Sequence, residues 1–259
     1  MKDLKGCGPE FITFLRRLID LSVKTACLPK DMKTGIIRPI FKGGDKKLYS
    51  NYRPISILNS IHKIIEKHVA NTLCNFVKNN NIINNNQFGF QQGKNTSQLS
   101  TKFRDDVHES MDKGLFNLCL FVDFRKAFDT LPHARILRAL KKIGVGGGML
   151  AWLEEYLRER TYKVKIKSET SSEVDITSGV AQGSFLGPLL YIIFTNSLAD
   201  ALTRMGVKFF MYADDTCVMV QGRSLADVHR KMQTVIDIMQ KWAHDNGIII
   251  NKKNVLYDD

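Results

Sequence analysis

The spacing of apolar side chains predicts three helices. Near the C-terminal end such residues recur every three or four positions, the period of one helix face, and the pattern ends at Gly247: Leu225, Val228, Met232, Val235, Met239 and Trp242. A coiled coil has similar spacing, but about 2.5 heptads is short for one, so packing against a sheet is expected. The segments 132–142 and 149–159 are also helical in pattern, with a glycine-rich break between them. Asp129 or Thr130 is expected to cap the first of these.

Two strongly apolar segments, 118–124 and 208–213, are typical of buried strands, and each runs directly into acidic residues. A third segment, 162–167, alternates as a half-exposed strand should, and 174–178 is expected to pair with it as a hairpin. The asparagine-rich run 79–87 is interpreted as a surface loop. Together these elements predict an α+β fold with acidic residues at strand ends.

The acidic residues at the strand ends are candidates for chemistry. Asp123 lies within one apolar run, whereas Asp214 and Asp215 fall between two, as at the tip of a hairpin. Adjacent aspartates at a turn are by themselves ordinary turn chemistry. Two such strands side by side would bring three carboxylates together, and a desolvated carboxylate is costly unless it is paired or binds a metal. Hard oxygen ligands suit Mg²⁺ or Mn²⁺, and two such ions about 3.5–4 Å apart support phosphoryl transfer. From the residues alone, nucleases and polymerases both satisfy this pattern.

The charge balance favours a polyanionic partner. The 259 residues carry a formal net charge of +12, and ten basic but only three acidic residues fall between Lys24 and Lys67. Such an excess favours nucleic acid or an anionic membrane surface, although a solvated basic face is the plain alternative. The longest apolar run, 189–194, is far shorter than the ~20 residues of a membrane helix, and the chain shows no signal-peptide pattern. We therefore expect a soluble protein that binds nucleic acid.

The cysteines and histidines indicate no structural cross-links. The five cysteines are odd in number and never form a C-x-x-C pair, and the six histidines do not pair at metal-ligand spacing. We expect neither a disulfide framework nor a zinc site, and a reducing intracellular compartment.

Six sequence blocks stand in a specific order along the chain. Two contain the aspartates: Y-A-D-D at 212–215 and F-V-D-F-R-K-A-F-D at 121–129. The other four are I-I-R-P-I-F-K-G-G-D at 36–45, N-Y-R-P-I-S at 51–56, Q-F-G-F-Q-Q-G at 87–93 and S-G-V-A-Q-G-S-F-L-G-P at 178–188. In order and spacing they resemble the blocks of reverse transcriptases, in particular those of non-LTR (LINE-type) retrotransposons. The resemblance extends over roughly residues 28–251 and favours a polymerase over a nuclease.

The resemblance implies a right-hand polymerase fold with an antiparallel palm sheet backed by helices. The fingers would comprise roughly 1–115 and 140–170, and the palm roughly 116–139 and 171–259. It further implies that the thumb is missing or incomplete, and that no endonuclease domain lies within this sequence.

The resemblance also implies a metal site. Asp123 and Asp214 would each bind two divalent ions, Mg²⁺ or Mn²⁺, with the backbone carbonyl of Phe124 assisting and Asp215 completing the site. Asp129 is assigned to capping and not to chemistry.

Substrate-binding roles are implied for five further positions: Lys42, Arg53, Phe128, Gln182 and Gly183. Lys42 and Arg53 would hold the incoming triphosphate and offset its charge, the alternative for either being a surface cation. Phe128 would exclude the ribose 2′-hydroxyl and so select deoxynucleotides, the alternative being a core phenylalanine. Gln182 and Gly183 would line the nucleotide and template strand, where glycine permits close backbone approach.

Several positions depart from the family's pattern. Gln91 stands where arginine is usual, which weakens an expected template or nucleotide contact. Asn254 falls on the position of a lysine, with Lys253 one residue earlier as a substitute proton donor to pyrophosphate. The terminal residues 257–259 echo the catalytic turn but have no strand after them, and are interpreted as a frayed end.

The leading hypothesis is an RNA-directed DNA polymerase, part of a mobile-element protein, that adds dNTPs to a DNA primer on an RNA template. The alternative is a catalytically inactive, nucleic-acid-binding remnant of such an enzyme. An RNA-templated RNA polymerase is less favoured, because that class usually carries G-D-D and lacks an aromatic gate. The resemblance implies a nuclear location and no membrane partner, and the sequence does not indicate an oligomeric state.

Overall fold

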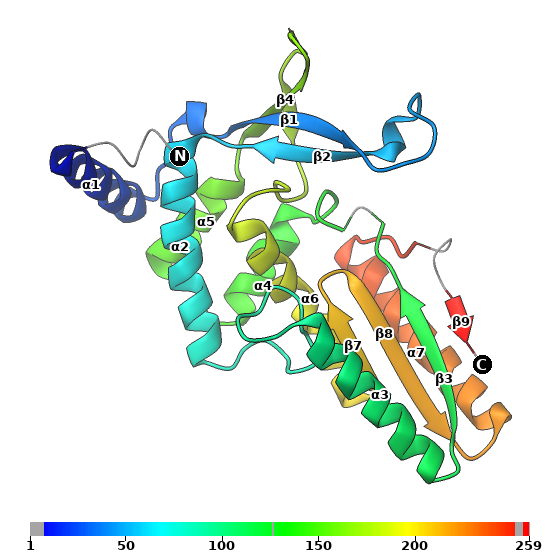
Figure 1. The fold of residues 1–259 in the computed structure, drawn as a ribbon. Coiled ribbons are helices and arrows are strands. Elements are labelled where there is room, and N and C mark those ends of the chain that lie inside the picture. Colours follow the sequence, from blue (N-terminus) through cyan, green and yellow to red (C-terminus); the bar gives the residue numbers. More distant parts are fainter. Residues whose placement is uncertain (1–7, 126, 252–255, 259) are drawn as a thin grey trace. The chain divides into compact units, whose positions relative to one another are not determined.

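The computed structural model describes residues 8–125, 127–251 and 256–258. The chain forms two compact units, each built from two stretches of sequence (Figure 1). Unit 1 comprises Met1–Asn79 and His133–Leu189, and unit 2 comprises Asn80–Pro132 and Leu190–Asp259. Residues 80–115, expected with the fingers, thus fall in unit 2, and residues 133–139 and 171–189, expected with the palm, fall in unit 1.

Unit 1 contains a five-stranded sheet in which β1 (Thr34–Phe41) is central. β1 pairs antiparallel with β2 (Tyr52–Ile57) and parallel with β4 (Arg160–Ile166). β4 in turn pairs with β5 (Glu169–Thr170) and β6 (Val174–Ile176), both antiparallel. The hairpin predicted for 162–167 and 174–178 is therefore confirmed, with Tyr162 opposite Val174.

Four helices belong to unit 1, and two of them confirm the sequence-based predictions. They are α1 (Pro9–Thr25), α2 (Ser60–Asn79), α4 (His133–Lys142) and α5 (Gly147–Leu157). Short 3₁₀ turns, η2 (Lys30–Met32) and η3 (Tyr49–Asn51), connect to the strands. The α4 and α5 segments are the helices predicted on either side of the glycine-rich break. Capping of α4 by Asp129 stays a prediction.

A buried polar network joins these helices. Glu66 of α2 has no exposed surface, and its Oε1 accepts hydrogen bonds from the Tyr156 hydroxyl (2.8 Å) and from the backbone N–H of Leu186 (3.1 Å). Leu186 is the first residue of α6 (Leu186–Arg204). A carboxylate at a helix N-terminus satisfies an otherwise orphaned N–H group and is favoured by the helix dipole. Glu66 therefore fixes where α6 begins.

Unit 2 contains a four-stranded sheet in the order β7-β8-β3-β9. The strands are β3 (Phe116–Val122), β7 (Lys208–Tyr212), β8 (Asp215–Gly222) and β9 (Leu256–Asp258), and all pairings are antiparallel. The interpretation of 257–259 as a frayed end is wrong for Tyr257 and Asp258, because β9 pairs with the outer edge of β3. Unpaired backbone groups on that edge supply the partners.

Helices cover both faces of this sheet. α3 (Thr96–Asp112) lies on one face of the sheet (Figure 1). There Leu99, Phe103 and Val107 pack against a cluster of Cys119, Phe210, Cys217 and Met219. α7 (Leu225–Asn246) packs on β3 and β8. Its predicted apolar face is confirmed as buried except at Leu225, and Gly247 ends it with φ 71°. The predicted packing of this helix on a sheet is thus also confirmed.

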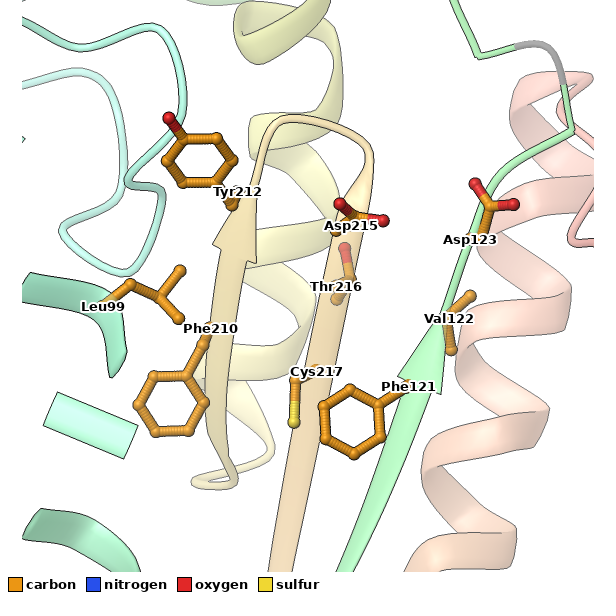
Figure 2. A pocket seen from close by; sticks show the side chains of 9 residues that line it. All are labelled: Leu99, Phe121, Val122, Asp123, Phe210, Tyr212, Asp215, Thr216 and Cys217. Atoms are coloured by element: carbon orange, nitrogen blue, oxygen red, sulfur yellow. The ribbon is translucent and has the colours of Figure 1, made fainter. Parts of the chain in front are cut away.

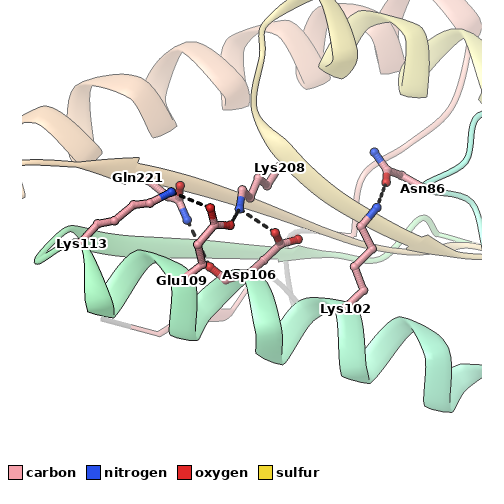
Figure 3. A network of polar contacts seen from close by, with 7 residues as sticks. All are labelled: Asn86, Lys102, Asp106, Glu109, Lys113, Lys208 and Gln221. Carbon is pink, nitrogen blue, oxygen red and sulfur yellow. Dashed lines mark hydrogen bonds and ion pairs between the residues drawn. The ribbon is translucent and has the colours of Figure 1, made fainter.

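Ion pairs join α3 to the N-terminal end of β7 (Figure 3). The ammonium of Lys208 on β7 contacts Asp106 at 2.6 Å and Glu109 at 3.0 Å. Burial lowers the pKa of Lys208, but its hydrogen bonds to these two carboxylates outweigh that effect and raise the pKa. At the other end of α3, Lys102 donates to the Asn86 side chain at 2.6 Å.

One expectation about surface character needs correction. The run 79–87 is not wholly a surface loop, because Ile83 and Gln87 are buried and Asn196 of α6 hydrogen-bonds to both Ile82 O and Asn84 N. By length and composition α6 could cross a membrane, although its longest unbroken apolar run is short. Of the long apolar stretch that meets this length, 67% is buried within the protein, as in a core helix. Its interspersed small and polar residues hid its length from the sequence pattern.

Candidate active site

The hairpin of β7 and β8 presents the acidic pair at its tip, as predicted. Tyr212 pairs with Asp215, which leaves Ala213 and Asp214 as the two-residue turn. Such turns require positive φ at one or both central positions, and Ala213 has φ 59°. This conformation costs a residue other than glycine roughly 1–2 kcal/mol. Strain of this kind persists only where the surroundings hold the backbone in place.

The strand carrying Asp123 lies directly beside this hairpin. β3 pairs with β8 from Phe116↔Gly222 to Val122↔Thr216, and the same register places Asp123 opposite Asp215. Figure 2 shows both side chains at the same end of their strands, at the rim of a cavity of about 410 Å³. The other residues that line the cavity are Leu99, Phe121, Val122, Phe210, Tyr212, Thr216 and Cys217. The two predicted acid-bearing strands, 118–124 and 208–213, lie in one sheet as expected, but β8 lies between them, so the neighbour of β3 is the second strand of the hairpin.

A segment near the end of the described chain fixes Asp123. Asn251 donates its backbone N–H to Asp123 O at 2.9 Å and its side-chain amide to Asp123 Oδ2 at 3.0 Å. Phe124 forms a bridge with Ile250, and Arg125 N donates to Ile249 O at 2.9 Å. The backbone after β3 is therefore held by pairing, not left as an open loop. Lys253 and Asn254, expected near this segment, lie outside the described residues.

The carboxylates interact electrostatically. Burial raises the pKa of Asp214, its own backbone N–H partly offsets this, and the charges of Asp215 and Asp123 raise the pKa further. Burial and then the charge of Asp123 raise the pKa of Asp215. Desolvation and like charge both disfavour ionised carboxylates, so a cation that binds here would relieve both.

The donor set fits a hard divalent cation. Three carboxylates supply anionic oxygen atoms, the ligand type preferred by Mg²⁺ and Mn²⁺. In the described part of the chain, however, no group of three or more His, Cys, Asp or Glu side chains is arranged closely enough to hold a metal ion. The three carboxylates thus lie in one region of unit 2, but they do not surround a single metal position. Binding of two metal ions stays a prediction, as does the assisting role of the Phe124 carbonyl.

Three aromatic rings pack together in unit 2, and one of them, Tyr191, interacts electrostatically with the aspartates. Phe128 is half-buried and stacks on Tyr191, with ring centroids 4.9 Å apart, and meets the edge of Phe90 at 5.9 Å. The Tyr191 side chain is fully buried, and burial followed by the charges of the three aspartates raises the pKa of its phenol well above its usual value. Phe128 is therefore held by two other rings, and its role as a gate stays a prediction.

Lys42 and Arg53 lie on the β1–β2 hairpin of unit 1. Arg53 pairs with Ile40, and Lys42 N donates to Asn51 O at 2.9 Å. This register puts Lys42 and Arg53 on the same face as diagonal neighbours, and both are exposed. The two cations can therefore act on one anionic group.

The Gln182–Gly183 turn joins the same hairpin. Gln182 O accepts the N–H of Ser56 at 2.8 Å, and Gly183 has φ 107°. A Cβ at Gly183 would lie 3.0 Å from Ser56 O, so glycine is required here on two grounds. Unit 1 thus brings the strand of Arg53 and the Gln182–Gly183 turn together, whereas the three aspartates and Phe128 belong to unit 2.

Several residues at these sites have no role in the sequence-based prediction. Gln87 and Gly89 contact the Ala213–Asp214 turn, Asn251 contacts Asp123, and Tyr191 stacks on Phe128. The Q-F-G-F and G-I-I-I-N blocks were visible in the sequence, but nothing in them indicated which backbone atoms they would meet. Tyr191 lies in an apolar run that gave no functional signal.

Sequence comparison finds relatives among mobile-element polymerases. The probable RNA-directed DNA polymerase from transposon X-element of Drosophila melanogaster is 29% identical over 251 residues, which cover 96% of this chain and 28% of the relative. The RNA-directed DNA polymerase from mobile element jockey of the same species is 29% identical over 248 residues, which cover 93% of this chain and 27% of the relative. The chain therefore spans little more than a quarter of these relatives' length.

Comparison with solved structures shows the same type of fold. A truncated apo telomerase from Candida tropicalis superimposes with a TM-score of 0.64 at 12% identity, covering 95% of this chain and 55% of the telomerase chain. Telomerase from Candida albicans gives a TM-score of 0.65 at 12% identity, and the match covers 88% of this chain and 43% of the telomerase chain. At this identity the likeness concerns the fold alone. The family model for reverse transcriptase (RNA-dependent DNA polymerase) matches residues 41–255. With most of its length matched, and with relatives from non-LTR retrotransposons, the chain belongs to the reverse transcriptase family.

Proposed function

We propose that the chain is the polymerase core of an RNA-directed DNA polymerase from a LINE-type element. The observation that carries the proposal is the β3–β8 ladder, which sets Asp123 beside the Ala213–Asp214 turn. In this proposal unit 2 acts as the palm and unit 1 as the fingers. The substrates are a DNA primer, an RNA template and dNTPs.

The proposed reaction is nucleotidyl transfer. The primer 3′-oxygen forms a bond to the α-phosphorus of the dNTP, the bond from that phosphorus to the β-phosphate bridge breaks, and pyrophosphate leaves. Two bound Mg²⁺ or Mn²⁺ ions would lower the pKa of the 3′-hydroxyl and neutralise charge on the leaving group. Asp123, Asp214 and Asp215, with the Phe124 carbonyl, would hold these ions. The chain's own contribution is to fix the carboxylates at adjacent strand ends.

Unit 1 would supply the contacts to the nucleotide. Lys42 and Arg53, diagonal on one face of the β1–β2 hairpin, would bind the triphosphate. Gln182 and Gly183 would line the nucleotide and the template, and Phe128 of unit 2 would exclude a 2′-hydroxyl. The joining of the Gln182–Gly183 turn to β2 supports a common role for these two segments.

Primer extension tests the proposal. The chain is incubated with dNTPs and a DNA primer annealed to an RNA template, with Mg²⁺ or Mn²⁺ and with EDTA. Extension is expected only with the metal, and Asp214→Asn is expected to abolish it. Asp237→Asn is the matched control, because Asp237 is exposed on α7 and contacts only Gln233 in the described part of the chain. Persistent extension by Asp214→Asn would refute the proposed metal role.

A second candidate function is nucleic-acid binding without catalysis. It is favoured by the basic stretch between Lys24 and Lys67. Filter binding at increasing salt, run beside primer extension, distinguishes the two. Binding that weakens steeply with salt but is never accompanied by extension supports this second function.

A further inference from the structure

Residues 86–88, at the start of the Q-F-G-F block, pair through their backbone with β7 of the β7–β8 hairpin. Phe88 N donates to Met211 O at 2.7 Å, and Met211 N donates to Asn86 O at 2.8 Å. Gln87 and Met211 form a parallel bridge between these bonds. The segment therefore runs along the free edge of β7 up to the turn that bears Asp214.

The Gln87 side chain reaches the turn itself. It is only 2% exposed, and its Oε1 accepts two backbone N–H groups, from Gly89 at 2.8 Å and from Ala213 at 3.1 Å. Both partners are donors, so the orientation of the amide is determined: its oxygen faces the turn. Its Nε2 has no hydrogen-bond partner among the described residues. A buried donor without a partner is unfavourable, so a gain elsewhere is needed to explain its presence.

Gly89 makes the closest backbone approach to the turn. A Cβ at this position would lie 2.2 Å from Ala213 N and 2.9 Å from Ala213 Cα. No side chain, not even a methyl group, can be accommodated without moving the turn. The Gly89 backbone therefore abuts the one turn residue that has positive φ.

Two polar side chains, one of them basic, hold the backbone of this segment. Lys94 donates to Asn85 O at 2.8 Å and to Gln87 O at 3.0 Å, and lies over the Phe88 ring at 5.3 Å. Gln91, which stands at the family's arginine position, also donates its side-chain amide to Gln87 O. The backbone that carries Gln87 is thus itself fixed by two side chains.

We propose that Gln87 and Gly89 are positioning residues that hold the strained Ala213–Asp214 turn, so that Asp214 points where a divalent cation is bound. The inference deepens the proposed function and rests on it for the cation. A neutral amide suits this position because a carboxylate would add a further negative charge beside the aspartates. The unpartnered Nε2 is the consequence of placing a neutral acceptor under the turn.

Hydrogen exchange at the turn tests the holding role without any metal. Gln87→Met keeps the length and volume of the side chain but removes the oxygen. The amide of Ala213 is expected to exchange about tenfold faster or more in this variant. Lys208→Met is the control, because Lys208 lies at the opposite end of β7 and its loss weakens the attachment of α3 instead. Exchange at Ala213 that stays equal in wild type and Gln87→Met would overturn the proposal.

Mn²⁺ binding tests the consequence for the carboxylates. Both Gln87→Met and Gly89→Ala are expected to raise the Kd for Mn²⁺ about tenfold or more, while Lys208→Met leaves it unchanged. An equal rise in all three variants would show a general loss of stability and overturn the positioning role. If the wild-type chain does not bind Mn²⁺ at all, the proposed function fails, and the exchange experiment still decides whether Gln87 holds the turn.

Discussion

Among single residues, Phe128 has the most specific expected effect on substrate choice. Its ring stacks on Tyr191, whose hydroxyl has no hydrogen-bond partner in the described part of the chain. Phe128→Ala should raise the ratio of ribonucleotide to deoxynucleotide incorporation by about 10–100-fold, because the space for the 2′-hydroxyl opens. Tyr191→Ala should raise it less, since only the supporting ring is lost. Competition assays with rNTP and dNTP mixtures measure the ratio.

Tyr191→Phe is the matched control for that series. It keeps the ring that stacks on Phe128 and removes a hydroxyl that makes no hydrogen bond to any described residue. Sugar selection as in wild type is expected. A ribonucleotide ratio that does not change in Phe128→Ala would show that this side chain is not a gate.

His62 should make stability depend on pH. Burial, with the charges of Arg160 and Lys63, lowers its pKa to about 3, and its ring stacks on Tyr156. In the unfolded chain the pKa is about 6.5, so below that pH the unfolded state binds a proton that the native state does not. Stability is therefore lost as the pH falls through this window. Between pH 7 and pH 5, the free energy of unfolding should fall by about 2 kcal/mol more in wild type than in His62→Gln.

Urea unfolding at several pH values measures this effect. The difference between wild type and His62→Gln isolates the one residue, since every other titrating group is common to both. A difference in unfolding free energy that stays constant from pH 7 to pH 5 would contradict the buried neutral state of His62.

The site could be predicted from sequence only where a residue's own surroundings were informative. The three aspartates stood out because each follows an apolar run. Gln87 and Asn251 did not, because their partner atoms lie 126 and 128 residues away in sequence and belong to the backbone or to another polar side chain. Contacts of that kind have no local pattern.

At the scale of elements, Glu66 joins α2 to the start of α6. Glu66→Ala should destabilise the protein by roughly 2–5 kcal/mol, because the Tyr156 hydroxyl and the Leu186 N–H would both remain buried without an acceptor. Glu66→Gln keeps an oxygen acceptor and should cost much less. Urea denaturation gives both values. Equal losses of unfolding free energy in Glu66→Ala and Glu66→Gln would show that the hydrogen bonds to Glu66 do not account for its stabilising effect.

Elements with regular side-chain periodicity were predictable, and those defined by backbone pairing were not. α7, α4, α5, β3 and the β7–β8 hairpin follow from apolar spacing and turn residues. β9 and the segment beside β7 are held by backbone hydrogen bonds at sheet edges, which any sequence can make. α6 was underestimated because its buried surface includes polar residues such as Thr195 and Asn196.

At the scale of the whole molecule, the chain separates the proposed functions between its units. Asp123, Asp214, Asp215 and Phe128 belong to unit 2, and Lys42, Arg53 and the Gln182–Gly183 turn belong to unit 1. The chain alternates between the units along its length, so neither unit is a continuous stretch of sequence. The division into fingers and palm stays a prediction.

In the proposed reaction, carboxylates from two remote strands bind the same divalent ions. Mn²⁺ titration followed by electron paramagnetic resonance tests it directly, with Asp123→Asn, Asp214→Asn, the double variant and Asp237→Asn as control. Each single active-site variant is expected to weaken binding about tenfold or more, and the double variant by less than the product of the two. Binding by Asp123→Asn that equals wild type would contradict the claim.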